Sequence, residues 1–214
     1  MTGAVRVSGP RAPGAPTAVT IDAAVCGDHV ADESLLVDAH GGVQNAVVAL
    51  RPAAPMPAAS VPAGEVRIDN AGCRFVPRVQ LVQRGQTVRV GNADPVLHNT
   101  RADLVGPPEV AVANLALPRA GATMDLTRRL GARLPEGPGE AMVRLGCDVH
   151  PWMRGWLVVV DSPYVAVTDA AGSYAIRDVP PGAYTLSVWH EVLGRHQRQV
   201  TVPATDGVTL DEKL

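Results

Sequence analysis

Three residues with metal-binding or nucleophilic side chains lie close together in the segment GCDVHPWMRGW, which runs from Gly146 to Trp156. They are Cys147, His150 and Met153. A thiolate is the nucleophilic and metal-binding form of cysteine, a neutral imidazole is a common metal ligand, and a thioether is a soft ligand. Their proximity therefore indicates a metal centre, a nucleophilic pair or simple packing, and the rest of the chain has to decide among these.

The residues before this segment predict a strand that directs the cysteine toward a core. In AMVRLGC, Val143, Leu145 and Cys147 share one phase of the strand, so the sulfur is expected to point inward. A tight loop follows, and Pro151 stiffens it between the histidine and the methionine. A strand followed by such a loop can bring a thiolate, an imidazole and a thioether to one point.

A fourth ligand must come from a different segment, and His98 in NADPVLHNT is the candidate. It lies just past a strand predicted at residues 86–91. Two imidazoles and a thiolate in a plane, with a weak axial thioether, suit blue copper. Thiolate and thioether favour Cu(I) whereas imidazole accepts Cu(II), so this ligand set favours a mononuclear copper site that cycles between the two states.

Residues 65–161, which contain these positions, resemble the cupredoxin (blue copper) family, in particular its amicyanin and plastocyanin-like members. The likeness consists of Phe-x-Pro, Gly-x-Thr-Val and Asn-x-Asp ahead of the first histidine, then C-x2-H-x2-M with proline directly after the histidine. It implies a Greek-key β-sandwich and an electron-transfer function. It also implies one copper ion with His98, Cys147, His150 and Met153 as ligands, and Asn99 as a residue that holds the two ligand loops together by hydrogen bonding.

Other chemistries fit the sequence less well. The six histidines contain no His-x-His pair, which a trinuclear oxidase cluster would need. Thioether is a poor zinc ligand, and a Cys147–His150 nucleophile pair lacks an evident oxyanion site. We therefore expect an electron carrier rather than an enzyme. The alternative from a different class is a non-redox binding, adhesive or copper-storing β-sandwich module in which copper is structural or absent.

The composition of the 214-residue chain is typical of an all-β protein. It contains 21 glycines, 19 prolines, 46% apolar and only 3% aromatic residues, which favours short strands joined by turns. A formal net charge of −2 without a basic run argues against nucleic-acid binding. No apolar stretch is long enough for a membrane span.

A second, smaller β-sandwich is expected outside residues 65–161. Residues 163–214 resemble the carboxypeptidase regulatory-like domain, a prealbumin-type sandwich, through TDAAGSYAIRDVPPGAY. This segment is too short for a whole sandwich of that kind, so its first strands are expected in the N-terminal segment 1–60, where GGVQNAVVAL resembles that family's second strand. The cupredoxin-like region would then be inserted into this sandwich; two independent domains are the competing layout. Residues 51–64 are predicted to be a stiff, proline-rich connector.

The other two cysteines bear on the compartment. If Cys147 is a ligand, Cys26 and Cys73 remain as an even pair, which suggests a disulfide; two unrelated buried thiols are the alternative. The N-terminus lacks the features of a signal peptide, so the protein is either cytosolic or has already lost a leader. The disulfide and the resemblance to amicyanin favour a periplasmic or extracellular location over the cytoplasm.

An electron carrier needs a redox partner protein, and the resemblance to amicyanin implies a dehydrogenase or a cytochrome. Trp152 and Arg154 in the ligand loop are candidates for docking it, with Arg101 on the rim. If the edge of the His150 ring is exposed, we expect electrons to pass there. Trp156 is expected to begin the buried strand instead.

Overall fold

The computed structural model describes residues 1–214 except positions 10, 13, 55–60, 138 and 205–207. The described chain is nearly all β, which confirms the predicted fold class. It divides into two compact units, of which unit 1 is Met1–Ala15, Ala31–Ala59 and Ser162–Leu214, and unit 2 is Pro16–Val30 and Ser60–Asp161. No helix among the described residues is long and apolar enough to cross a membrane.

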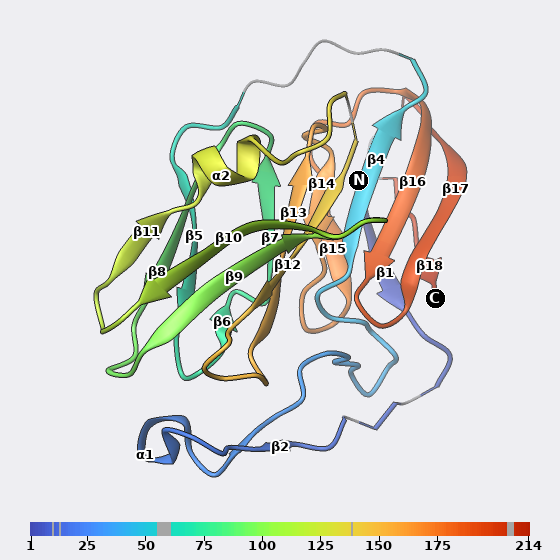
Figure 1. Ribbon diagram of the computed structural model, residues 1–214. Coiled ribbons are helices and arrows are strands. Elements are labelled where there is room, and N and C mark those ends of the chain that lie inside the picture. Colours follow the sequence, from blue (N-terminus) through green and yellow to red (C-terminus); the bar gives the residue numbers. More distant parts are fainter. Residues whose placement is uncertain (10, 13, 55–60, 138, 205–207) are drawn as a thin grey trace. The chain divides into compact units, whose positions relative to one another are not determined.

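Two sheets of unit 2 pack around a single core (Figure 1). The five-stranded sheet has the order β10-β9-β12-β13-β7, and the four-stranded sheet has the order β11-β8-β5-β6. Their strands are β5 (Glu65–Asn70), β6 (Phe75–Val76), β7 (Val79–Gln83), β8 (Thr87–Asn92), β9 (His98–Leu104), β10 (Val110–Leu117), β11 (Thr123–Asp125), β12 (Ala141–Gly146) and β13 (Arg154–Val160). A short helix, α2 (Thr127–Gly131), follows β11.

Alternating apolar side chains decide which face of each strand is buried. In β5, Val66 and Ile68 face the core, and in β12 Val143 and Leu145 do so. Burying an apolar side chain of this size stabilises the fold by about 1.5–3 kcal/mol. Cys147 continues the phase of β12 and is only 4% exposed, so the core-facing strand delivers its sulfur to the interior.

Strands β9 and β10 are not predicted from the sequence pattern, although β9 is an inner strand of the larger sheet, between β10 and β12. The reason is that β9 begins with three buried polar residues, His98, Asn99 and Thr100, and so lacks an apolar alternation. Buried polar groups need hydrogen-bond partners, and Thr100 receives one such bond from Asn70 at 3.3 Å. This strand is defined by its tertiary partners more than by its own pattern.

Residues 16–30 belong to unit 2, although they lie far from its main segment in the sequence. β2 (Thr17–Ala18) pairs antiparallel with β3 (His29–Val30), and the single turn of α1 (Ala23–Cys26) lies between them. Cys26 and Cys73 form a disulfide. Residues 16–30 of the N-terminal segment 1–60 therefore lie with unit 2, because the disulfide attaches them to the turn between β5 and β6.

Unit 1 pairs strands from both ends of the chain. In one sheet β4 lies between β14 and β16, with β17 beyond, and in the other β1 lies between β15 and β18. The strands are β1 (Thr2–Arg6), β4 (Val47–Pro52), β14 (Val165–Val167), β15 (Ser173–Ala175), β16 (Gly182–His190), β17 (Gly194–Val202) and β18 (Glu212–Lys213). In the sequence, residues 60–161 thus lie between β4 and β14, two strands that pair in one sheet of unit 1. Of the predicted connector 51–64, positions 55–60 lie outside the described residues.

A truncation in β4 tests how much this strand contributes to unit 1. The side chain of Leu50 is fully buried, whereas that of the next residue, Arg51, is exposed. Leu50→Ala is expected to lower the free energy of unfolding by about 2–5 kcal/mol, because it removes buried apolar surface and leaves a cavity. Urea unfolding followed by circular dichroism measures the loss. The control Arg51→Ala should change it by less than about 0.5 kcal/mol, and equal losses would contradict the packing of β4.

Candidate metal centre

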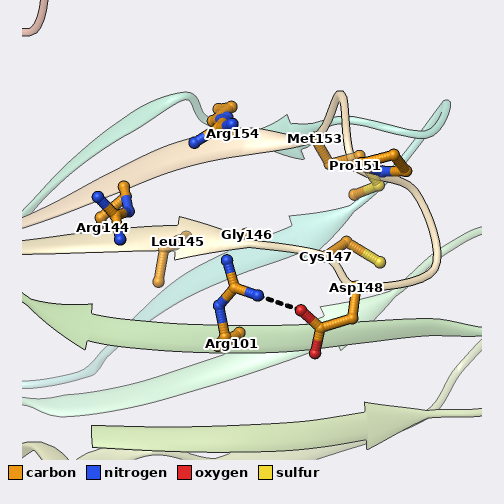
Figure 2. Close-up of a pocket in the computed structure, with 9 residues that line it drawn as sticks. All are labelled: Arg101, Arg144, Leu145, Gly146, Cys147, Asp148, Pro151, Met153 and Arg154. Carbon is orange, nitrogen blue, oxygen red and sulfur yellow. Dashed lines mark hydrogen bonds and ion pairs between the residues drawn. The ribbon is translucent and has the colours of Figure 1, made fainter. Parts of the chain in front are cut away.

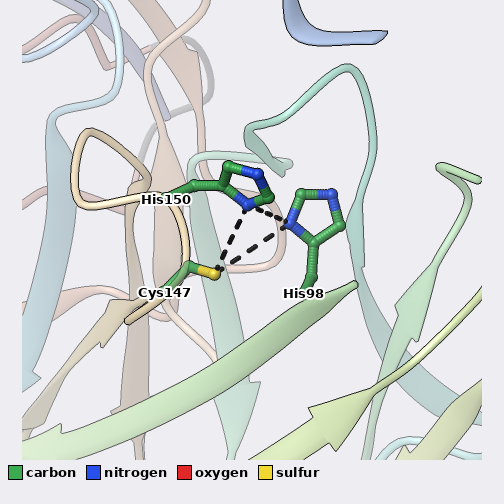
Figure 3. Close-up of side chains that lie close together, drawn as sticks. All are labelled: His98, Cys147 and His150. Atoms are coloured by element: carbon green, nitrogen blue, oxygen red, sulfur yellow. Dashed lines mark hydrogen bonds between the residues drawn. The ribbon is translucent and has the colours of Figure 1, made fainter. Parts of the chain in front are cut away.

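Two segments of unit 2 bring three of the predicted ligands together (Figure 3). His98 is the first residue of β9, and Cys147 and His150 lie in the loop between β12 and β13. Nδ1 of His98 lies 2.9 Å from Nδ1 of His150, and Sγ of Cys147 lies 4.0 Å and 3.8 Å from these two nitrogens. Both histidines are 0% exposed.

The three donor atoms fit around a single metal ion. A triangle with sides of 2.9, 3.8 and 4.0 Å has a circumradius of about 2.1 Å, so one point in its plane is equally far from all three atoms. Typical metal–nitrogen bonds measure about 2.0–2.1 Å and metal–sulfur bonds about 2.3 Å in tetrahedral sites. The donor spacing therefore suits a metal held in the plane of two imidazoles and one thiolate.

A carboxylate holds the far side of each imidazole. Nε2 of His98 lies 2.9 Å from Oδ2 of Asp94, and Nε2 of His150 lies 3.1 Å from Oδ2 of Asp22. An ionised carboxylate only accepts hydrogen bonds, so each Nε2 carries the proton in these contacts. Both Nδ1 atoms then direct lone pairs toward the same point. A proton or a metal cation between them removes the repulsion, and this supports a cation site.

The surroundings of Asp94 and His98 favour these protonation states. Burial raises the pKa of the Asp94 carboxyl, but N–H donors from Cys73 and Gly72, together with His98, bring this pKa below its ordinary value. Burial lowers the pKa of His98, against the opposing effect of Asp94. At neutral pH the pair is therefore a carboxylate and a neutral imidazole, the form of histidine that binds metals.

Asn99 supports the sulfur and ties the ligand loop to β9. Its backbone N–H donates to Sγ of Cys147 at 3.5 Å. Its side-chain Oδ1 accepts the backbone N–H of Asp148 at 2.7 Å. Its Nδ2 donates to the Asp148 carboxylate and to Oδ1 of Asn114. One side chain thus connects the two segments that carry the donors.

Met153 lies at the end of the ligand loop and is 2% exposed, in the same core as Cys147. Both residues line a pocket of about 290 Å³ that is also lined by Arg101, Arg144 and Arg154 (Figure 2). Met153 thus lies in the same core and lines the same pocket as Cys147, and it stays the predicted axial ligand.

The other predicted loop residues differ in exposure. Pro151 and Arg154 are exposed and line the pocket. Trp152 is half-buried, with its ring centroid 5.2 Å from that of His150. Trp156 is half-buried in β13, and Arg101 forms ion pairs with two nearby aspartates. Among the predicted docking residues, Arg154 is thus the more accessible and Trp152 mainly covers a ligand.

The condition for an electron route through His150, an exposed ring edge, is not met. The His150 side chain is 0% exposed, and its Nε2 is in contact with Asp22. The reason is the segment of residues 16–30, which the Cys26–Cys73 disulfide attaches to unit 2. A carboxylate from this segment closes the ring edge that the sequence analysis leaves open.

Asp94 and Asp22 are the site residues that the sequence analysis does not assign. Asp94 lies in the Asn-x-Asp motif four residues before His98, so a signal for it was present. Asp22 is 128 residues away from its partner His150 in the sequence. Its only sequence signal is the position of Cys26 one helical turn later.

Comparisons with known proteins give structural similarity alone. No protein-family description matches the chain, and no curated protein does. A reduced mutant of amicyanin is similar at 24% identity over 52% of this chain and 97% of its own, with a TM-score of 0.35. A purple cupredoxin from Nitrosopumilus maritimus is similar at 21% identity over 44% of this chain and 97% of its own, with a TM-score of 0.31. A copper-containing nitrite reductase from Thermus scotoductus SA-01 is similar at 23% identity over 52% of this chain and 26% of its own, with a TM-score of 0.33.

Replacing Asn99 tests how the ligand loop is held. Asn99→Ala removes the side-chain bonds to Asp148 and leaves the backbone donor to the sulfur in place. The free energy of unfolding of the metal-free protein is expected to fall by about 1–3 kcal/mol, because the part-buried hydrogen bonds from the Asn99 side chain to the backbone and carboxylate of Asp148 are lost. Urea unfolding measures the change. Asn114→Ala, which removes a partner at the exposed rim, is the control and should lower the free energy of unfolding by less. A larger loss in Asn114→Ala than in Asn99→Ala would contradict the role of Asn99.

Proposed function

We propose that unit 2 is a mononuclear blue-copper electron carrier, with one copper ion bound by His98, Cys147 and His150 and more weakly by Met153. The observation that carries the proposal is the donor triangle, whose three atoms are equally far from one point at about a metal–ligand distance. Copper bound there would supply one-electron chemistry between Cu(I) and Cu(II). A ligand set of imidazole, thiolate and thioether accepts both states.

The residues of the chain would keep the ligand geometry constant in both states. Asn99 holds the loop and donates to the Cys147 sulfur, while Asp94 and Asp22 fix the two imidazole rings. Groups that are already oriented need little reorganisation when the charge at the centre changes. Such rigidity favours fast electron transfer.

We infer a carrier rather than an enzyme from the burial of the donors. His98 and His150 are 0% exposed and Cys147 is 4% exposed. Catalytic metal sites usually keep a coordination position open to substrate or water. A closed set of donors supports transfer of electrons over a distance instead.

The proposal includes a redox partner protein, a dehydrogenase or a cytochrome, that approaches near the ligand loop. Trp152 and Arg154 are our candidates for contacting it, and transient electron-transfer interfaces are small. The Cys26–Cys73 disulfide supports an oxidising location, periplasmic or extracellular. For unit 1 we propose a carboxypeptidase regulatory-like sandwich, on the resemblance of residues 163–214.

The copper site is tested by adding Cu(II) to the metal-free protein and to Cys147→Ser. The wild type is expected to develop an intense blue absorption band and narrow copper hyperfine splitting, because the thiolate is a direct ligand. The variant should lose both, since a serine hydroxyl is a much poorer donor. Visible absorption and electron paramagnetic resonance spectra measure them.

The same titration decides between this function and its alternative. A blue band that disappears on reduction and returns on oxidation, with copper retained, supports electron transfer. A pale Cu(II) spectrum, or no copper binding, would contradict the proposal and favour a non-redox binding module.

The role of Met153 is tested by Met153→Leu, a substitution of similar volume. The blue band is expected to persist, because the thiolate and both imidazoles remain. The reduction potential is expected to rise, because Cu(II) prefers a higher coordination number than Cu(I) and is destabilised more when the weak axial donor is removed. Voltammetry measures the potential. An unchanged potential would show that Met153 fills space without coordinating.

A further inference from the structure

The two carboxylates that hold the ligand histidines belong to one covalently linked frame. Asp94 accepts the backbone N–H groups of Gly72 and Cys73. Cys73 is joined to Cys26 by the disulfide, and the single turn of α1 leads from Cys26 back to Asp22. The frame therefore runs from the imidazole of one ligand histidine to that of the other.

The Asp94 end of the frame is a backbone anion site. Gly72 and Cys73 have φ values of 58° and 56°, so both lie in the left-handed region. Successive residues in such a turn direct their N–H groups to one point, and here they donate to the Asp94 carboxylate at 2.8 and 2.9 Å. The half of the disulfide that contains Cys73 thus fixes the carboxylate that holds His98.

The Asp22 end is fixed by the turn of α1. The carbonyl oxygen of Asp22 accepts the N–H groups of Val25 and Cys26, both at 2.9 Å. Asp22 itself has a φ of 56°, a conformation that aspartate tolerates better than most residues. Its carboxylate is 32% exposed, whereas the His150 ring that it contacts is 0% exposed. The acid therefore lies between the ring and the solvent.

We propose that Asp22 is a positioning residue for His150, and that residues 16–30 form a fixed cover over the metal centre, fastened by the Cys26–Cys73 disulfide. The proposal rests on the copper function proposed above. Asp22 accepts a hydrogen bond from Nε2–H of His150, so that Nδ1 of the same ring points to the metal. The same contact closes the edge of the ring by which a partner could otherwise reach the site.

The charge of Asp22 has a defined effect on the metal. A negative charge attracts Cu(II) more strongly than Cu(I), and the attraction is strong where water is excluded. Asp22 therefore stabilises the oxidised state and lowers the reduction potential. An exposed carboxylate elsewhere on the segment is screened by solvent and has little effect.

Four variants separate the effects of the Asp22 charge, of its hydrogen bond to His150 and of the Cys26–Cys73 disulfide. Asp22→Asn removes the charge but keeps an acceptor oxygen, and asparagine also tolerates positive φ. Asp22→Gly removes the side chain without backbone strain. Asp28→Asn removes the same charge from an exposed position of the segment and is the matched control. Cys26→Ser/Cys73→Ser unfastens the segment and leaves Asp22 in place.

In the copper-loaded protein, both Asp22 variants are expected to raise the reduction potential, while Asp28→Asn leaves it near that of the wild type. Asp22→Gly is expected to weaken copper binding by about 10- to 100-fold, as loss of a carboxylate behind a ligand histidine does elsewhere. Asp22→Gly and the double serine variant are expected to speed electron self-exchange, because both uncover the ring edge. Voltammetry, competition with a chelator and NMR line broadening measure these three quantities.

A readout without copper keeps this proposal separate from the proposed function. In ¹⁵N NMR of the metal-free protein, the Nε2 proton of His150 is expected to exchange slowly with water in the wild type and rapidly in Asp22→Gly. A blue centre whose potential is the same in Asp22→Asn and Asp28→Asn, with a rapidly exchanging Nε2 proton in the wild type, would overturn the role of Asp22. If the Nε2 proton of His150 exchanges slowly but the protein binds no copper, the copper function is overturned. The role of Asp22 in holding and covering the His150 ring would then still stand.

Discussion

The structure depends on holding two imidazole nitrogens 2.9 Å apart with both lone pairs directed at the same point. Without a cation or a proton between them this arrangement is repulsive, so it persists only where the rings cannot turn away. Carboxylates at the two Nε2 atoms prevent that rotation. The Cys147 sulfur lies 3.8 to 4.0 Å from these nitrogens and is the third candidate donor.

The sheet places these donors by strand pairing. Because β9 and β12 are antiparallel neighbours, the first residues of β9 lie beside the loop that follows the end of β12. His98 and Cys147 meet there, and His150 follows within the same short loop. Asn99 then links the two segments through Asp148. The donors are therefore carried by a ladder of backbone hydrogen bonds, which gives the rigidity that the proposed electron-transfer centre would need.

The sequence predicts the parts of this site that depend on local pattern. The alternation of Val143, Leu145 and Cys147 predicts that the sulfur points into the core. The short spacing from Cys147 to His150 and Met153 predicts the tight loop that follows. Strand β9 does not follow from its pattern, because its first residues are polar and are buried only through tertiary hydrogen bonds. Asp22 does not follow either, since its contact with His150 spans 128 residues and depends on a disulfide at another position.

The cover over His150 needs the disulfide for an energetic reason. Helix α1 contains no buried residue, and Ile21 and Val25 are exposed, so hydrophobic burial contributes little to ordering this segment. The Asp22–His150 contact is a single hydrogen bond, so a covalent link has a large share in holding residues 16–30 in place. A disulfide adds about 2–4 kcal/mol, mainly by restricting the unfolded chain, and it joins the segment within one helical turn of Asp22. The geometry of the proposed metal centre and the oxidation state of Cys26 and Cys73 are thus linked.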